Sequence, residues 1–381
     1  MNGNETLEKI FQAAISLIES NQINQISDEI TKDVDYLIVK IDSNKSIVSA
    51  LVTSLVKKIL EPTQDIRLHR VDFEGGYSAR SLDTKVTTLF FKNHFPKYAN
   101  KESSFLTLAT RERIKWTKDE GQNLKIRDKK LRSSFLNIFE QVEENKQNPE
   151  IYLKYIFAKL IKLSESEASL FELTETQSQN LSALNIQLVL EMLKKHFAIK
   201  LSSRLPVVAI YSIYEILLPK FERYKNKKLL PLQVHTSSDK HGFGDIEIYD
   251  NQDKPFEIIE IKHNIPIDKY LIFDIVKKTQ NTQISRYYIL TTFQNGFANE
   301  LAEKAVTEYI LQIKQQSNLD IIANGIISTL KYYLRFVDDC GEFIKIYTKN
   351  LIVDAKDSTE VKSFHLEEWN EILRTYKIEN K

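Results

Sequence analysis

The segment HGFGDIEIYDNQDKPFEIIEIKHN, residues 241–264, decides the fold that we expect for this chain. It contains two short runs rich in isoleucine, 245–250 and 256–263, separated by polar residues and a proline. Apolar residues such as isoleucine that alternate with polar ones are typical of β-strands. Because the link from Asp250 to Pro255 is short and turn-like, the two runs predict an antiparallel hairpin.

Two carboxylates and one amine are expected on one face of this hairpin. Asp245 opens the first strand, and Glu260-Ile261-Lys262 lies near the end of the second. Side chains two residues apart in a strand project to the same side, so Glu260 and Lys262 face the same way. The hairpin can then bring Asp245 beside them.

A simpler interpretation is a cross-strand salt bridge on a solvated face, and three observations favour a functional site instead. The neighbours of Glu260 are isoleucines of a strand that we expect to be buried, where an unpaired carboxylate is costly. Asp245 follows Gly242-Phe243-Gly244 in a chain with only nine glycines, so the backbone there is expected to approach a ligand closely. The order of the surrounding elements is the third observation.

The elements around the hairpin predict a mixed sheet with helices packed on it, and hence an α+β fold class. A helical period runs from Pro206 to about Tyr224, and the strand-like run LLPLQVHT follows at 229–236. After the hairpin come a helical stretch, Asp268–Lys278, and the strand-like run RYYILTT at 286–292. A meander of strands followed by a helix and a returning strand is typical of a mixed sheet.

The rest of the chain is expected to be mainly helical. A length of 381 residues favours two domains over one. We expect a helical region over 1–200, a core over 201–300, and a helical C-terminal extension over 301–381 that packs on the core and contains one strand at Leu319–Ile322. Apolar residues recur at helical spacing in the N-terminal region at 7–18, 30–39, 47–60, 131–139, 151–163 and 181–197.

A second glycine-containing segment, FEGGYSARSLDTKVTTLFFKNHFP at 73–96, turns from a loop into a helix near Ser81. Backbone amides at such a helix start, together with Arg80, would suit a phosphate or the edge of a base. The alternative is a tight loop capped by Ser81, with Asp83 in the first turn favouring the helix dipole. The residues that could contact a phosphate or a base here are Tyr77, Ser78, Arg80 and Lys85.

Local charge bears on this second segment, although the net charge of +1 says nothing about partners. From Glu61 to Arg132 there are 16 Lys or Arg against 10 Asp or Glu, a local net charge of +6. Such a stretch either faces a polyanion or is an ordinary solvated surface. Further contacts and base stacking could come from Arg111, Arg113, Lys115 and Trp116.

Composition excludes several classes of protein. Cys340 is the only cysteine, so neither an intrachain disulfide nor a cysteine-rich zinc site can form. The first twenty residues predict an amphipathic helix rather than a signal peptide, and the apolar stretches end short of the ~20 residues that a membrane span needs. No GxxxxGK[ST] or methyltransferase motif occurs. We therefore expect a soluble cytoplasmic protein without ATP-driven translocation.

The sequence around the hairpin resembles the PD-(D/E)xK nuclease motif. Gly244-Asp245 is followed fifteen residues later by Glu260-Ile261-Lys262, and Gly244 stands where the motif has its proline. The helix, three strands, helix and strand from Pro206 to Thr292 are similar to the conserved core of that superfamily, over about a quarter of the chain. The resemblance implies a restriction-endonuclease-like core, a mixed sheet flanked by helices.

The resemblance also implies a role for each residue of the motif. Asp245 and Glu260 would bind Mg²⁺ together with the backbone carbonyl of Ile261, and Lys262 would orient or activate the attacking water. Hard carboxylate oxygens suit Mg²⁺, which polarises a phosphate and activates a bound water. Glu215 matches the position of an additional acidic residue on the preceding helix in many such nucleases, although a helix-surface glutamate is equally consistent.

Other residues near the two segments are weaker candidates. Glu247 shares a strand face with Asp245. His235, His241 and His263 flank the motif and are interpreted as DNA contacts or as support for the motif. The segment 73–96 also resembles part of the N-terminal halves of some type II restriction endonucleases.

The leading hypothesis is a type II restriction endonuclease that hydrolyses phosphodiester bonds of double-stranded DNA at specific sites with Mg²⁺. The expected partners are double-stranded DNA, a second copy of the chain in a homodimer because two strands need two active sites, and a separate DNA methyltransferase of the host. The alternatives are a structure-specific repair or mobile-element nuclease of the same superfamily, and an inactive DNA-binding protein that keeps the fold. The intact Asp, Glu and Lys argue against the inactive protein.

Overall fold

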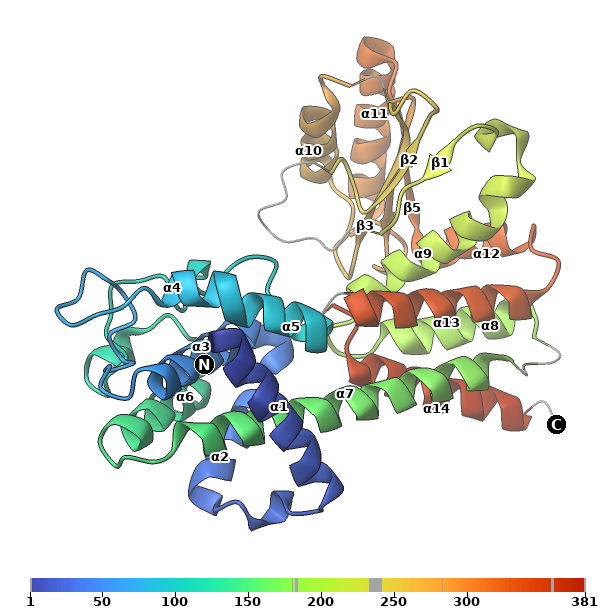
Figure 1. The fold of residues 1–381 in the computed structure, drawn as a ribbon. Helices are drawn as coiled ribbons and strands as arrows, with labels where there is room; N and C mark the ends of the chain where they lie inside the picture. The colour runs from blue at the N-terminus through green and yellow to red at the C-terminus, as the bar shows by residue number, and fades with distance from the viewer. Residues whose placement is uncertain are drawn as a thin grey trace. The chain divides into compact units, whose positions relative to one another are not determined.

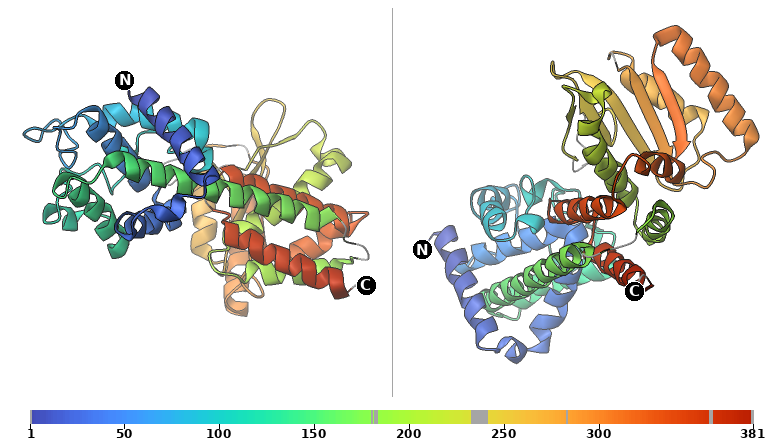
Figure 2. Two further views of the ribbon diagram at one scale, coloured as in Figure 1. Left: turned by 60° about the horizontal axis from the view of Figure 1, so that its bottom comes forward. Right: turned by 90° about the vertical axis from the view of Figure 1, so that its right-hand side faces the viewer.

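The computed structural model describes residues 2–179, 181, 184–232, 242–282, 284–357 and 360–379. The chain divides into two units, unit 1 with residues 1–168 and unit 2 with residues 169–381. The division falls within α7, Pro149–Gln179, which is the long green helix of Figures 1 and 2. It therefore lies earlier than the boundary expected near residue 200.

Unit 1 is built from helices, as the apolar periodicity predicts. Helix α3 is buried over almost its whole circumference from Ser46 to Val56, because its sequence is apolar or small on every face, and it forms the centre of the unit. Asn2 and Glu5 cap α1 reciprocally, and Asp128 caps α6. The helices are α1 Gly3–Glu19, α2 Asp28–Val39, α3 Ile41–Leu60, α4 Ala79–Leu82, α5 Thr88–His94, α6 Lys129–Glu143 and the first part of α7.

Unit 2 combines helices with one five-stranded sheet in the order β1-β2-β3-β4-β5. Strands β1 to β3 pair antiparallel, and β3 to β5 pair parallel, so the sheet is mixed. This confirms the α+β class and the returning strand predicted after the hairpin. The strands are β1 Lys228–Leu229, β2 Ile246–Tyr249, β3 Pro255–Lys262, β4 Arg286–Thr291 and β5 Asp320–Gly325.

Each parallel pair of strands is joined by a helix on the same face of the sheet. Helix α10, Lys269–Thr279, leads from β3 to β4, and α11, Glu300–Ser317, leads from β4 to β5. Asp268 and Asn299 accept hydrogen bonds from backbone amides of the first turns and fix where these helices begin. Figure 1 shows both helices beside the sheet. Their apolar residues pack on Ile258, Tyr287, Ile289 and Ile321 of the strands.

The opposite face of the sheet packs on a second layer of helices. Ile246, Ile248, Ile259 and Ile261 belong to one buried cluster with the apolar residues of this layer. The helices are α8 Ile186–Phe197, α9 Arg204–Leu217, α12 Ile326–Leu334, α13 Cys340–Asp357 and α14 Ser363–Glu379. Strand β3 is therefore buried on both faces, which explains its nearly continuous run of isoleucines.

Two predicted elements differ from the structure. The helix expected to reach Tyr224 ends at Leu217, because Pro219 cannot continue an α-helix, and short 3₁₀ turns follow. Of the run at 229–236, Leu229 lies in β1 and residues 230–232 are not in a strand, while residues 233–241 lie outside the described part of the chain. The strand predicted at Leu319–Ile322 is found as β5, so the segment after residue 300 adds an edge strand to the sheet. Among the described helices, none combines the length and the apolar character needed to cross a membrane.

A buried histidine makes the stability of unit 2 depend on pH. His196 of α8 is fully buried, and its ring nitrogens lie 2.8 Å from the Tyr347 hydroxyl and 2.9 Å from the His365 carbonyl oxygen. Burial lowers the pKa of His196 to about 3. Because the folded-state pKa is depressed, this histidine stabilises the fold fully above the unfolded pKa of about 6.5, and that stability is lost as the pH falls towards 3.

We predict that the free energy of unfolding falls by up to about 1.4 kcal/mol per pH unit below about pH 6 on account of His196 alone. His196→Gln removes this titration, so its stability should depend less steeply on pH over the same range. Urea unfolding of both proteins at pH 7, 6 and 5 measures the difference. Parallel pH profiles for the two proteins would contradict the assignment.

Candidate functional site

The pairing of β2 with β3 brings Asp245 against the Glu260-Ile261-Lys262 segment. Ile246 pairs with Ile259, and the Asp245 amide donates a hydrogen bond to the Ile259 carbonyl oxygen at 2.9 Å. At Ile261 the partner is a side chain instead of the backbone: the Ile261 amide donates a hydrogen bond to Oδ2 of Asp245 at 2.7 Å. The carboxylate of Asp245 is thereby fixed on the backbone between Glu260 and Lys262.

Glu260 is nearly buried and is surrounded by hydrogen-bond donors. Only 9% of the residue is exposed. Its Oε1 accepts from Nζ of Lys262 at 2.6 Å, while Oε2 lies 3.6 Å from Nζ of Lys278 and 3.4 Å from the hydroxyl of Tyr287. A buried carboxylate is costly unless it is paired, and here two ammonium groups and a phenol compensate it.

The pKa of Tyr287 is affected by the negative charge of this site. Its pKa is raised by burial first, and then by the negative charges of Glu260 and Asp245. The hydroxyl therefore stays protonated and donates at 2.7 Å to the carbonyl oxygen of Phe243, in the loop that precedes Asp245. Tyr287 and Lys278 were not singled out by the sequence, because their roles depend on the β3–β4 register and on the packing of α10.

The loop before β2 is held by a second buried acid, Glu247. Only 5% of Glu247 is exposed, and its Oε1 accepts from the amides of Phe243 and Gly244 at 2.5 and 3.3 Å. A Cβ on Gly244 would lie 2.5 Å from a methyl carbon of Ile258 and 2.8 Å from the Ile259 carbonyl oxygen, so this position has no room for a side chain. Glu247, a weaker candidate in the sequence, therefore positions the backbone that carries Asp245.

A cavity of about 370 Å³ opens beside the motif, between β3, β4 and α10. Its wall includes the carboxylate of Glu260 and three lysines, Lys262, Lys277 and Lys278, the last two from the end of α10. Asp274 is the second acid in the lining. The cavity therefore presents a cluster of cations around one nearly buried carboxylate, an arrangement that suits an anionic ligand.

The structure does not place Glu215 with the motif. Glu215 lies on α9, which packs on the opposite face of the sheet, and its carboxylate accepts from Asn350 at 2.8 Å and from Lys349 at 3.4 Å. Both partners belong to α13. Its observed role is to join α9 to α13, which agrees with the simpler interpretation of a helix-surface glutamate.

Of the flanking histidines, the structure describes His263. Nδ1 lies 3.0 Å from the Thr292 hydroxyl, and Nε2 lies 3.1 Å from the Ser202 hydroxyl. Burial lowers the pKa of His263, which favours the neutral ring. His263 thus connects the end of β3 to the end of β4 and to the start of α9. His235 and His241 lie outside the described residues.

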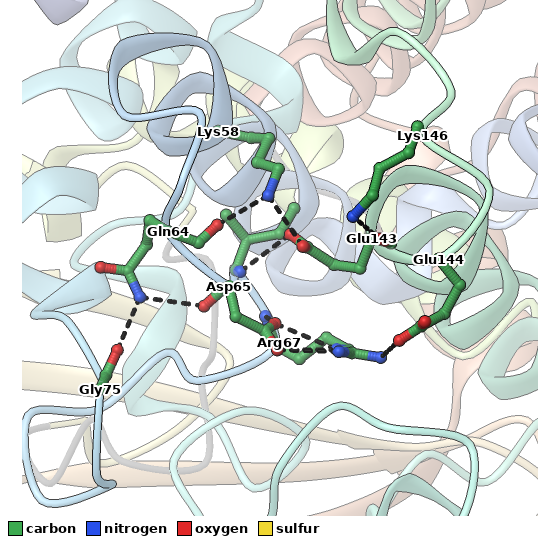
Figure 3. A network of polar contacts seen from close by, with 9 residues as sticks. Lys58, Gln64, Asp65, Arg67, Gly75, Glu143, Glu144 and Lys146 are labelled. Carbon is green, nitrogen blue, oxygen red and sulfur yellow. Dashed lines mark hydrogen bonds and ion pairs between the residues drawn. The ribbon is translucent and has the colours of Figure 1, made fainter.

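In unit 1, a polar network holds the loop that carries the glycine pair (Figure 3). Lys58 of α3 donates to Glu143 of α6 at 2.8 Å and to the Gln64 carbonyl oxygen at 2.9 Å. The side chain of Gln64 in turn donates to the carbonyl oxygen of Gly75 at 2.7 Å. A Cβ on Gly76 would lie 1.9 Å from the Arg70 carbonyl oxygen, so the loop closes tightly on itself there.

Three residues in and near this segment have roles that differ from the expected ones. Ser81 does not cap a helix, since α4 begins at Ala79. Asp83 is fully buried and accepts hydrogen bonds from Ser49, Thr53, Ser103 and the Ser104 amide, so it anchors the loop 103–110 rather than interacting with a helix dipole. Trp116 is also fully buried and stacks on His69, with 4.0 Å between the ring centroids.

The four predicted DNA contacts of this segment divide into one core residue and three surface residues. Tyr77 is buried, and its hydroxyl donates to Ser54 at 3.1 Å. Ser78 and Arg80 are exposed and line a cavity of about 400 Å³ whose other cations are Arg70 and Arg111. Lys85 is exposed at a neighbouring hollow of about 350 Å³.

Two cations of the Arg80 cavity have no compensating acid among the described residues. Arg70 pairs with Asp72, 2.8 Å away, whereas the side chains of Arg80 and Arg111 make no hydrogen bond or ion pair with any described residue. Phe105 and Leu106 form an apolar part of the wall. The wall therefore carries three arginines and one acid, Asp72.

The motif offers two carboxylates as candidate metal ligands. Across the residues that the structure describes, no group of three or more His, Cys, Asp or Glu side chains is arranged to hold a metal ion. Asp245 nevertheless accepts a hydrogen bond from Ile261, the neighbour of Glu260, and the two carboxylates offer hard oxygen donors, which suit Mg²⁺ because it keeps several waters and takes few protein ligands. Neither a scan of protein-family models nor a search of curated proteins finds a match to this chain.

Proposed function

We propose that this chain is a Mg²⁺-dependent endonuclease that hydrolyses phosphodiester bonds of double-stranded DNA, with the site specificity of a type II restriction enzyme. The observation that carries the proposal is the contact of Asp245 with the backbone of the Glu260-Ile261-Lys262 segment, on paired strands of a mixed sheet. The element order α9, β1 to β3, α10 and β4 parallel to β3 supports the proposal, because it is the order from which the resemblance was drawn.

In the proposed mechanism, Asp245, Glu260 and the Ile261 carbonyl would hold the cation. Mg²⁺ bound there would supply polarisation of the scissile phosphate and a water of lowered pKa. Lys262 lies 2.6 Å from Glu260 and is close enough to orient the attacking water beside that carboxylate. Lys277 and Lys278 line the same cavity, and their charges stabilise the negative charge that develops on the phosphate as it is attacked.

Tyr287 and Lys278 position Glu260 in this mechanism. The tyrosine hydroxyl contacts both Glu260 and the Phe243 carbonyl oxygen, so it joins the two strands that carry the acidic residues. Lys278 reaches the second oxygen of Glu260 from α10. Both contacts restrict the rotamer of a side chain whose carboxylate must meet a cation and a phosphate together.

For unit 1 we propose a role in DNA recognition through Arg80, Arg111 and Ser78. Guanidinium groups without an acidic partner bind phosphates or the edge of a guanine in the major groove. A homodimer would supply one active site for each strand, and a separate methyltransferase would protect host DNA. Cleavage of branched DNA in preference to linear duplex would instead favour the repair or mobile-element alternative.

We predict that the purified protein cuts unmethylated phage-sized DNA into discrete fragments with Mg²⁺ and not with EDTA. Glu260→Gln should reduce the rate by roughly 100-fold or more, because it removes a charge at the site where the cation and phosphate meet. Gel electrophoresis of timed digests measures both effects. Glu308→Gln, an exposed glutamate of α11, is the matched control and should cut like the wild type.

Two results would contradict this function. Wild type that leaves several unmethylated DNAs uncut would favour an inactive binding protein. A Glu260→Gln variant that cuts as fast as the wild type would place the chemistry elsewhere.

We also predict that Arg80→Ala weakens binding of duplex DNA in EDTA and lowers the dependence of affinity on salt by about one counterion. Arg111→Ala should have a similar effect, because both arginines line one cavity without an acidic partner. Fluorescence anisotropy of a labelled duplex over a salt series measures the slope. Arg374→Ala is the control, since Arg374 pairs with Glu371 on α14. An unchanged affinity in both cavity variants would remove this surface from the DNA-binding account.

A further inference from the structure

A second hollow of unit 2 lies where β3, β4 and β5 begin, whereas the Glu260 site lies towards the end of β3. It consists of two adjoining cavities that share Arg223 and Arg286 in their walls. The first, of about 480 Å³, is lined mainly by the aromatic rings of Phe221, Tyr224, Tyr288, Tyr333 and Phe336. The second, of about 650 Å³, is polar and adds a third cation, Lys314.

Three residues of the aromatic cavity's wall donate hydrogen bonds to a buried acid that the nuclease chemistry does not use. Glu257 of β3 is fully buried. Oε1 accepts from the hydroxyls of Tyr214 at 3.0 Å and Tyr224 at 2.8 Å, and Oε2 accepts from Arg223 at 2.9 Å. These three donors compensate the buried charge and fix the orientation of the rings, so the cavity walls are preorganised.

The aromatic cavity suits a planar, partly polar ring. The hydroxyl oxygens of Tyr333 and Tyr214 lie 3.4 Å apart. The centroids of the two rings are 5.8 Å apart and the ring planes meet at 76°, so both edges and faces of aromatic rings surround the cavity. Aromatic side chains stack on nucleobases, with about 1–3 kcal/mol lost per base when one is removed. The Tyr224 hydroxyl is already engaged with Glu257, whereas burial raises the pKa of Tyr288, whose hydroxyl stays protonated at neutral pH.

The polar cavity suits an oxyanion. Its cations are Arg223, Arg286 and Lys314, and its acid is Asp320, which lies 3.5 Å from Nε of Arg286. Arg286 opens β4 and takes part in both walls, so one guanidinium can meet a ligand that spans the two cavities. Guanidinium groups bind phosphate through paired, charge-assisted hydrogen bonds.

We propose that the joined cavities form a nucleotide-binding site, with a nucleobase against the tyrosines and a phosphate at Arg286 and Lys314. The two volumes fall in the range of small-ligand pockets, about 300–1,000 Å³. A free mononucleotide and a nucleotide extruded from DNA offer this same chemistry. The proposal goes beyond the endonuclease function and holds whether or not the Glu260 site cuts DNA.

Calorimetric titration with AMP, CMP, GMP and TMP in EDTA tests the proposal without any contribution from cleavage. At least one of them should bind saturably, and Tyr333→Leu and Arg286→Gln should each weaken that binding tenfold or more. The controls are Tyr332→Leu, the exposed neighbour on α12, and Arg374→Gln on α14, and both should bind like the wild type. Thermal unfolding of each variant verifies that the fold is retained.

The nucleoside of whichever mononucleotide binds separates the two cavities, because it carries the base without the phosphate. Its binding should weaken in Tyr333→Leu and be less affected by Arg286→Gln than binding of the nucleotide is. A duplex with 2-aminopurine in EDTA tests the second source, since an extruded base becomes more fluorescent. A rise in emission that Tyr333→Leu abolishes, without binding of free mononucleotides, identifies DNA as the source. The proposal is overturned if neither probe responds, or if both lining variants bind as the wild type does.

Discussion

The arrangement of unit 2 depends on a strand that is buried on both faces and still carries carboxylates. Isoleucines of β3 pack on α10 and α11 on one side and on the α9 layer on the other. Glu257 and Glu260 of the same strand project to opposite faces, and each is compensated by donors from other elements. Removing one partner of such a buried charge costs about 3–5 kcal/mol, so the surrounding helices and strands are held in one arrangement.

This constraint separates two chemical environments along one sheet. Glu260 lies among lysines and opens to a cationic cavity, whereas Glu257 is enclosed by tyrosines and one arginine. In the proposed enzyme, the first environment would hold a cation at Glu260, with Lys262 close by to orient the attacking water. The second keeps its own hydrogen bonds and offers aromatic and guanidinium walls to a separate ligand.

Much of the core could be predicted from the sequence, because hydrophobic period and turn chemistry are local properties. The hairpin, α10, β4 and β5 follow from runs of isoleucine, from Pro255 and from helix caps such as Asp268. The contact between Asp245 and the Glu260 segment follows from the hairpin register. The sequence predicted a close approach of the backbone at Gly244 to a ligand, whereas the close approach in the structure is to Ile258 and Ile259 of the neighbouring strand.

The remaining features depend on contacts between distant residues that no local pattern encodes. Lys278 and Tyr287 reach Glu260 only through the packing of α10 and the parallel register of β4. Glu215 lies at the sequence position expected for an additional acidic residue of the site. Its hydrogen-bond partner in the structure is on α13, because Glu215 lies on the face that α9 presents to that helix. In unit 1, charge counting indicated a basic surface, whereas the burial of Asp83 and Trp116 depends on how α3 and α6 enclose the loops.

The central claim is that the Asp245 and Glu260 carboxylates together hold a divalent cation. Titration with Mn²⁺, with the free ion followed by electron paramagnetic resonance, tests it directly in the wild type and in Asp245→Asn. The account predicts saturable Mn²⁺ binding by the wild type that Mg²⁺ displaces and that is lost in the variant. Equal Mn²⁺ binding by the two proteins would contradict it.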